Sequence, residues 1–268
     1  MSAFDYVRPA SVGEALRHLQ MPGAFALAGG QSLLYATRAR RVKPTLLVDI
    51  GRLAEMAGVT VEAGVMRIGA LTTHSQLAAS PLVRTLVPGL ALAAGHVADP
   101  AVRHRGTVGG SLAENHLQAD YTAIFLALAA TVSTTRRTMA LSHFLQPSGE
   151  TALDQGELIL AVTFALPLAF AYAKFPHPAS KYALVGVAIS RNDSGPSVAV
   201  TGAGRFGAFS WPEAAAALGP EINPAAIEAL RFERHDLLGH DHSASAPYRA
   251  QLMTVMAGRA AQALWTQH

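Results

Sequence analysis

The chain has 268 residues, of which 50% are hydrophobic and 15% are charged, and its formal net charge at pH 7 is +3. This composition predicts a well-packed globular protein of one large domain or two to three small ones, and it excludes a largely disordered chain. Cysteine is absent, which excludes disulfides, a thiolate nucleophile and cysteine-ligated zinc or iron–sulfur sites.

The first fifty residues predict a compact βαβ-like unit. Ser11 is placed to cap a helix, and Glu14 stands at the position that a capping box requires. The expected elements are a strand at 4–7, a helix at 12–19, a strand at 25–28, a helix or turn at 33–40 and a strand at 45–50.

The next hundred residues predict hairpins and short helices. Ala63-Gly64 separates two strand-like runs, Pro81 suits the first position of a helix, and Pro88 is expected to kink or split that helix. Asp120 is expected to open an apolar helix. The expected elements are a hairpin at 59–62 and 65–69, helices at 73–79, 81–93 and 121–129, a hairpin at 131–134 and 138–143, and a strand at 158–166.

The pattern changes near Phe170. Two antiparallel strands, 182–190 and 197–201, are expected around the turn Asn192-Asp193-Ser194-Gly195, followed by helices at 212–218, 224–230 and 247–264. Strands and helices alternate irregularly along the chain, so the predicted fold class is α+β in three parts.

Two glycine-rich stretches are the strongest candidates for a binding site. One is Ala28-Gly29-Gly30-Gln31-Ser32-Leu33, and the other is Gly106-Thr107-Val108-Gly109-Gly110-Ser111. Glycine permits positive φ and a close approach of ligand to backbone N–H groups, and such turns bind phosphates. Together the two turns are predicted to grip one extended diphosphate ligand; the alternative is that both are ordinary tight turns between core elements.

Other motifs indicate structure more than chemistry. Gly202-Ala-Gly204-Arg-Phe-Gly207 fits the dinucleotide pattern, but no helix is expected to open on it, so it is interpreted as a turn at a strand end. The histidines and aspartates from His235 to His242 are interpreted as a polar loop in preference to a metal site. Lys174, taken alone, is interpreted as a surface lysine. No nucleophile elbow or H-E-x-x-H motif is present.

Other classes of protein lack their signals. No apolar run reaches the roughly 18 residues of a membrane helix, and residues 1–8 lack a secretory signal pattern. Basic residues gather only at Arg38, Arg40, Arg41 and Lys43, too few for a nucleic-acid face. We therefore expect a cytoplasmic protein without membrane insertion or nucleic-acid binding.

Taken together, the motifs resemble a known family, the flavin-binding medium subunit of molybdenum-containing hydroxylases, such as the carbon monoxide dehydrogenase medium subunit and the xanthine dehydrogenase FAD-binding subunit. The resemblance covers essentially the whole chain. The matching segments are Phe4-Asp5-Tyr6 with Pro9, Ala28 to Leu34, Leu47-Val-Asp-Ile50, Ile68-Gly-Ala-Leu-Thr-Thr73, Val102-Arg103 with Gly106 to Ala113, Glu157-Leu-Ile159 and Tyr248-Arg249.

The resemblance implies a two-subdomain FAD-binding fold of the PCMH/vanillyl-alcohol-oxidase type, with subdomains at 1–55 and 56–168, followed by a small α+β C-terminal domain at 170–268. It also implies that the chain itself supplies no catalytic side chain and no metal ligand, because FAD carries the chemistry. The implied FAD contacts are Ala28, Gly29, Gly30, Gln31, Ser32, Leu33, Val97, Thr107, Val108, Gly109, Gly110, Ser111, Asp120, Ile159 and Lys174.

One stretch departs from the family pattern. Where the family commonly has Ala-Asp-Pro-Ala-Ala-Asp, this chain has Asn115-His116-Leu117-Gln118-Ala119-Asp120. The aspartate is kept, but the proline that fixes the preceding turn is missing. The resemblance therefore carries Asp120 over and leaves the contacts of the four residues 115–118 open.

In this family, a large subunit with molybdopterin cofactor and a small subunit with [2Fe–2S] clusters are partners in a dimer of heterotrimers. The implied function is that of an oxidoreductase subunit: non-covalent FAD accepts electrons from the iron–sulfur subunit and passes them to NAD, oxygen or another acceptor. The alternative is a free-standing flavin-dependent oxidoreductase of related fold with its own substrate site. Such an enzyme needs a proton donor beside the flavin, and the sequence offers no convincing one.

Overall fold

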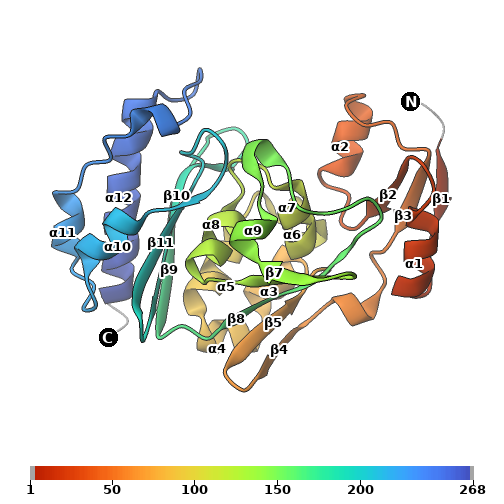
Figure 1. Cartoon of the computed structure of the whole chain (residues 1–268), viewed down its shortest axis with the longest axis horizontal. Helices are drawn as coiled ribbons and strands as arrows, with labels where there is room; N and C mark the ends of the chain where they lie inside the picture. Colours follow the sequence, from red (N-terminus) through yellow and green to blue (C-terminus); the bar gives the residue numbers. More distant parts are fainter. Residues whose placement is uncertain (1–3, 266–268) are drawn as a thin grey trace.

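The computed structural model describes residues 4–265 and arranges them as three sheets along the long axis of the molecule (Figure 1). The strand orders are β1-β3-β2 in the N-terminal sheet, β4-β5-β8-β6-β7 in the central sheet and β12-β11-β10-β9 in the C-terminal sheet. Helices accompany all three sheets, which confirms the α+β class. The domain boundaries remain a prediction, and their outer ends at 1–3 and 266–268 lie outside the described residues.

The N-terminal sheet is parallel, as a βαβ unit requires. It contains β1 (Asp5–Val7), β2 (Ala24–Leu27) and β3 (Leu46–Asp49), with β1 and β2 both parallel to β3. Ser11 caps α1 (Val12–Leu19) by accepting the Glu14 N–H. The Glu14 carboxylate accepts the amide of Ala10, at 2.7 Å, where a capping box would have it accept that of Ser11. α2 (Leu33–Arg38) connects β2 to β3.

The central sheet is antiparallel throughout. It is made of β4 (Val59–Glu62), β5 (Val65–Gly69), β6 (Thr131–Thr134), β7 (Thr138–Ala140) and β8 (Ile159–Ala165). The expected strand at 138–143 is wrong in its second half. There the chain forms α9 (Leu141–Phe144), which buries Leu141 and Phe144 in the core.

Short helices lie between β5 and β6. They are α3 (His74–Ala79), α4 (Pro81–Leu86), α5 (Pro88–Gly95), α6 (Pro100–Arg105), α7 (Val108–Glu114) and α8 (Asp120–Ala127). Pro88 splits α4 from α5, as expected. The structure adds α6, which the sequence did not predict.

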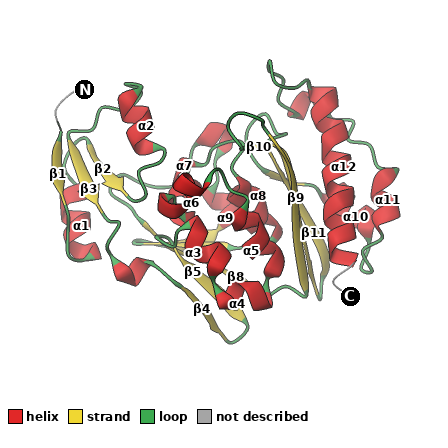
Figure 2. Ribbon diagram, turned by 180° about the vertical axis from the view of Figure 1, so that it is seen from behind, coloured by secondary structure: helices red, strands yellow, loops and turns green. Residues whose placement is uncertain are grey.

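The C-terminal sheet lies between two layers of helices (Figure 2). Its antiparallel strands are β9 (Ala169–Pro176), β10 (Ala183–Asn192), β11 (Gly195–Thr201) and β12 (Phe209–Ser210). α12 (Ala246–Trp265) packs on β9 and β10, and α8 packs on β10 and β11 from the central side. α10 (Pro212–Leu218) and α11 (Pro224–Glu228) complete the outer layer.

Arg249 ties α12 to this sheet. Its side chain is 2% exposed, and Nη1 donates to the carbonyls of Leu184 and Gly202 at 3.0 and 2.6 Å. Nη2 donates to Asp241 at 2.8 Å. The Tyr248-Arg249 motif therefore has a structural use in this chain, which is to fix the last helix on the C-terminal sheet.

None of the helices between residues 4 and 265 combines the length and the hydropathy that crossing a bilayer demands.

Candidate cofactor-binding site

The first glycine-rich segment connects β2 to α2 and keeps its backbone donors free. Gly30 has φ +74°, the left-handed region that glycine adopts without strain. Within residues 4–265, no backbone N–H from Gly29 to Leu33 donates to a protein acceptor. A row of free amides around a left-handed residue is the geometry in which proteins bind anions. The first glycine-rich segment therefore has the backbone geometry that the predicted phosphate-binding turn requires.

The second segment is not a turn, and the prediction is wrong on this point. Residues Val108–Glu114 form the helix α7, which Thr107 caps by accepting the Gly110 N–H at 3.1 Å. Gly109 and Gly110 do not have positive φ. The amides of Val108 and Gly109 donate to the carbonyls of Thr72 and Ala70, at 3.0 and 2.8 Å. The amides from Val108 to Ser111 are therefore bonded within the protein and form no nest.

The two adjacent glycines of α7 are needed for different reasons. A Cβ on Gly109 would lie 2.5 Å from the Ala70 Cβ and 2.8 Å from the Ala70 carbonyl oxygen, so this position allows close packing of the helix on the central sheet. A Cβ on Gly110 would lie 2.8 Å from the Thr107 Oγ1, which would have to shift, and would meet no other segment within 4 Å. Gly110 thus has open space on its outer side.

The two segments touch although they are far apart in sequence. A Cβ on Gly29 would lie 2.0 Å from the Arg105 carbonyl oxygen, so only glycine allows the first segment to approach the end of α6. The Ser32 hydroxyl donates to the Glu114 carboxylate at 2.5 Å. Gly110 and Glu114 are one helical turn apart and share a face of α7. The open side of Gly110 therefore belongs to the face that Ser32 contacts.

Basic residues add positive charge where the first segment approaches the end of α6. The last turn of α6 carries Arg103, His104 and Arg105. Arg103 is fixed by its donations to the carbonyls of Val97 and Ala98, at 2.9 and 2.8 Å. The Arg105 side chain is exposed. Free amides, open space and nearby positive charge together fit the diphosphate of the predicted FAD.

Asp120 and Lys174 form a buried ion pair. Their side chains are 3% and 9% exposed, and the Lys174 Nζ lies 3.0 Å from the Asp120 Oδ2. The interpretation of Lys174 as a surface lysine is wrong. The family resemblance names both residues as FAD contacts, and that role remains a prediction. Burial raises the pKa of Asp120 above its ordinary value, and the Lys174 ammonium opposes that shift.

Tyr172 completes this pair, and the sequence analysis missed it. Its hydroxyl donates to the Asp120 Oδ1 at 2.5 Å. Gly186 leaves room for that hydroxyl, because a Cβ there would lie 2.2 Å from it. Tyr172 and Lys174 are two apart in β9 and so lie on one face of the sheet. A strand predicted at 169–176 would have placed Tyr172 on the same face as Lys174, and so could have identified it.

The segment between α7 and α8 is well fixed despite its missing proline. Asn115 takes φ 42°, and its Nδ2 donates to the carbonyls of Gln146 and Glu150 at 3.0 and 2.6 Å. The carbonyls of Leu117 and Gln118 accept the amides of Gly202 and Ala183, at 3.0 and 3.2 Å. Hydrogen bonds to three distant segments thus take the place of a rigid residue.

His116 joins this segment to the hairpin of β9 and β10. Its ring stacks on Tyr182, with centroids 4.3 Å apart and planes inclined by 20°. Burial lowers the pKa of His116 and raises the pKa of Tyr182 to about 12. Both side chains are therefore neutral near pH 7.

His74 lies buried against Gly106, at the start of the second glycine-rich segment. Its Nδ1 lies 3.1 Å from the Tyr121 hydroxyl, and a Cβ on Gly106 would lie 2.7 Å from its Nε2. Burial and the charge of Arg103 lower the pKa of His74 to about 4. A neutral imidazole thus supports the backbone just before α7.

The remaining predicted contacts remain predictions. Ile159 is 5% exposed in β8, and the half-buried Val97 packs against the same core. Gln31 is exposed, and its Nε2 donates to the Gly29 carbonyl at 3.2 Å. Their contact with the cofactor is implied by the family resemblance alone.

The other motifs lie outside this site. Gly202 follows β11 with φ +78° and opens no helix, which confirms the turn interpretation. In the described part of the chain, no three histidine, aspartate or glutamate side chains gather as metal ligands would. Asp241 has a structural use: the amides of Ser243 and Ala244 and the Arg249 guanidinium outweigh the effect of burial and lower the pKa of its carboxyl.

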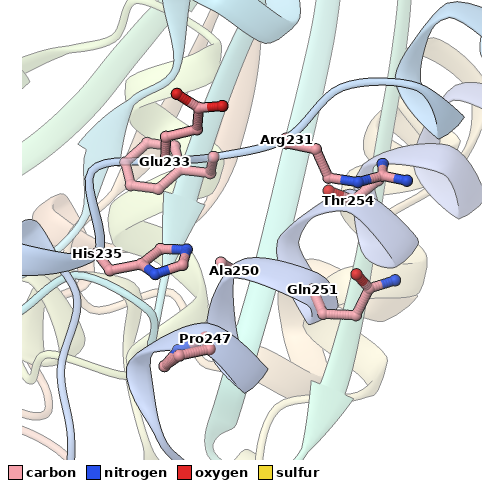
Figure 3. A pocket seen from close by; sticks show the side chains of 8 residues that line it. Arg231, Glu233, His235, Pro247, Ala250, Gln251 and Thr254 are labelled. Atoms are coloured by element: carbon pink, nitrogen blue, oxygen red, sulfur yellow. The ribbon is translucent and has the colours of Figure 1, made fainter.

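Several pockets border the C-terminal part, and residues of α12 line two of them. One, of about 300 Å³, is formed by α12 and the segment before it, and no predicted cofactor contact lines it (Figure 3). The other, of about 570 Å³, is bounded by residues 116–118 on one side and by Arg205, His240 and Asp241 on the other.

Comparison with known proteins places this chain among relatives of one family. The model of a family described as "FAD binding domain in molybdopterin dehydrogenase" matches residues 2–167. The carbon monoxide dehydrogenase medium chain of Hydrogenophaga pseudoflava is 36% identical over 204 residues, covering 73% of this chain and 71% of that protein. The nicotine 6-hydroxylase medium subunit of Paenarthrobacter nicotinovorans is 30% identical over 266 residues, 94% of each chain.

A solved structure extends the similarity to the complete fold. Quinoline 2-oxidoreductase from Pseudomonas putida 86 contains a chain that superposes with a TM-score of 0.90 at 28% identity, covering 99% of this chain and 98% of that one. The C-terminal sheet and its helices are thus shared, although the family model ends before them.

Proposed function

The chain belongs to the family of FAD-binding domains in molybdopterin dehydrogenases, and from this premise we propose that it holds FAD between its two glycine-rich segments as the medium subunit of a three-subunit molybdenum hydroxylase. When bound, FAD supplies the redox chemistry, taking up electrons that arrive from an iron–sulfur subunit and releasing them to NAD, oxygen or another acceptor. The protein supplies position, charge and exclusion of water.

The observation that carries the proposal is the row of free amides from Gly29 to Leu33 beside the open side of Gly110. Phosphate oxygens accept hydrogen bonds, and unpaired backbone N–H groups are the donors that suit them. Gly110 leaves space for the ligand next to those donors. Ser111, one residue further along α7, can add a hydroxyl.

The Asp120–Lys174–Tyr172 group has a positioning role in this proposal. It joins the first residue of α8 to β9 of the C-terminal sheet with short, charge-assisted hydrogen bonds. Both carboxylate oxygens of Asp120 already have protein donors. Asp120 therefore serves the site by holding the central and C-terminal parts in register.

The partners follow from the premise and from what the chain lacks. Without cysteine, it cannot hold [2Fe–2S] clusters in the usual way. We therefore propose a small iron–sulfur subunit and a large molybdopterin subunit as partners, assembled as a dimer of heterotrimers in the cytoplasm. The exposed Arg38, Arg40 and Arg41, and the exposed strip of α12 with Tyr248 and Val255, are candidate contact areas.

The test uses the purified full chain. Acid precipitation should release FAD into the supernatant, because the cofactor is held without a covalent bond. Anaerobic addition of purines, aldehydes, N-heterocycles or carbon monoxide should leave the flavin colour unchanged until the partner subunits are added. A chain that binds no FAD would contradict the proposal, and bleaching of the flavin by a substrate without partners would identify a free-standing flavoenzyme instead.

A further inference from the structure

We propose that Glu114 is a positioning residue of the FAD site, which orients the first glycine-rich segment through its hydrogen bond with Ser32. This inference rests on the proposed function and names a residue to which neither the sequence motifs nor the family resemblance assigns a role. The juxtaposition of Ser32, at the start of α2, with Glu114, in the last turn of α7, is the observation behind it.

The geometry makes Glu114 the side-chain link between the first segment and α7, the helix that begins in the second segment. The Ser32 hydroxyl donates to the Glu114 Oε2 at 2.5 Å across 82 residues of sequence. The only other contact described above between the segments is the backbone approach of Gly29 to Arg105. One contact is steric and the other is directional, so together they set both the distance and the orientation of the segment.

The hydroxyl of Ser32 has only one hydrogen to donate. Because Glu114 accepts that hydrogen, the hydroxyl of Ser32 is not the donor that the diphosphate uses. The ligand is left to the backbone amides from Gly29 to Leu33, which have no protein acceptor in the described chain. Ser32 therefore aids binding by holding those amides in place, and Glu114 aids it by holding Ser32.

The charge of Glu114 acts in the opposite direction. A carboxylate close to a diphosphate repels it, so the role of Glu114 cannot be to attract the ligand. What the site requires from this side chain is an acceptor oxygen at the right place. A glutamine has such an oxygen and carries no charge, which separates the two effects.

The test is a double-mutant cycle on FAD affinity, measured by quenching of flavin fluorescence on the folded full chain. Glu114→Ala and Ser32→Ala should each weaken FAD binding about tenfold, the effect of losing one hydrogen bond to a charged group at the modest end of its range. In the Ser32→Ala background, Glu114→Ala should change Kd by less than about twofold, because the bond is already gone. Glu114→Gln should bind FAD as tightly as the natural chain or more tightly.

The controls distinguish this inference from the proposed function. Failure of the natural chain to bind FAD would contradict the proposed function itself. Natural FAD binding together with an unchanged Kd in Glu114→Ala, an equal loss in both backgrounds, or a Gln variant as weak as the Ala variant would each overturn the role of Glu114 alone. Glu62→Ala, at an exposed carboxylate of β4, is the matched control and should leave Kd unchanged. Thermal unfolding of each variant checks that its fold is intact.

Discussion

The two glycine-rich segments look alike in sequence and differ in structure. In the first, Gly30 is left-handed and the amides from Gly29 to Leu33 are free in the described chain. In the second, Gly109 and Gly110 are helical, and their amides are bonded to Ala70 and Thr107. A pair of glycines therefore indicates either a backbone exposed to a ligand or a helix packed tightly on its neighbour.

The two segments therefore contribute to the site in different ways. The second segment needs no ligand to satisfy the amides from Val108 to Ser111, which are bonded within the protein. His74 lies against Gly106 at the start of this segment, and the Asp120–Lys174 pair fixes the first residue of α8, the next helix along the chain. The first segment keeps donors that have no acceptor in the described part of the protein. Substitutions that disturb the packing around the second segment should therefore lower the stability of the chain. Substitutions in the first segment, or in the space facing it, should lower its FAD content.

Gly110→Val should have the largest effect on the cofactor. The side chain would fill the open space facing the first segment, so we expect the purified variant to contain no FAD while it stays folded. Flavin absorbance and thermal unfolding are the measurements. Full FAD content in a folded Gly110→Val chain would remove this space from the site.

Gly109→Val is the matched variant one residue away. Its branched side chain would overlap the Ala70 Cβ and carbonyl, so the loss should appear in stability, at the upper end of the about 1–3 kcal/mol that overpacking costs. Equal stability of the two variants would contradict the division between the neighbouring glycines.

Lys174→Met should have the largest effect on stability. It leaves the Asp120 carboxylate buried without its cation, which costs about 3–5 kcal/mol of unfolding free energy, to be measured by urea denaturation at pH 7. The penalty should shrink as the pH falls, because a buried carboxyl with a raised pKa becomes neutral on protonation. Arg234→Met, at an ion pair whose side chains are 55% and 51% exposed, is the control and should cost less than about 1 kcal/mol. Equal losses would show that the Asp120 pair gives no special support.

The stability of the chain should fall in acid because of His74. Its pKa is lowered from 6.5 to about 4 in the folded chain, so the unfolded chain binds the proton first as the pH drops through that window. The expected loss is about 3 kcal/mol of unfolding free energy between those two pH values. His74→Gln, which does not titrate, should remove that part of the pH dependence. An unchanged profile would show that His74 is protonated without cost.

Asn115→Ala should have the smallest effect. It removes the donors to the Gln146 and Glu150 carbonyls and places alanine at φ 42°, which together should cost about 1–2 kcal/mol. Asn115→Gly, which adopts that φ freely, should recover part of the loss. Urea midpoints of the three chains give the comparison, and no difference between the Ala and Gly variants would show that the backbone conformation is unimportant.

Much of the fold could be predicted from local pattern. The capped helix after Ser11, the split at Pro88 and the antiparallel pair around Asn192 each depend on neighbouring residues, and the structure contains all three. β9 was missed, because its short side chains, Ala169, Ala171 and Ala173, give no clear alternation. The helix α7 was mistaken for a turn because glycine lowers helix propensity, and the packing of Gly109 on Ala70 that overrides this is a tertiary contact.

The sequence named candidate residues for the site but not how the fold connects them. The family resemblance named Asp120 and Lys174 but could not show that they bind each other across 54 residues. Glu114 carried no signal in sequence, since it acts only through a partner that the fold brings close, and finding Tyr172 required the strand β9 to be recognised first. The free amides of the first segment are a property of the folded backbone.

Amide hydrogen exchange with and without FAD tests the central claim most directly. The amides from Gly29 to Leu33 should exchange fast in the chain without cofactor and become protected when FAD binds. Those of Gly109 and Gly110, already bonded to Ala70 and Thr107, should change little. Protection of Gly109 and Gly110 on FAD binding, with fast exchange continuing from Gly29 to Leu33, would contradict the account.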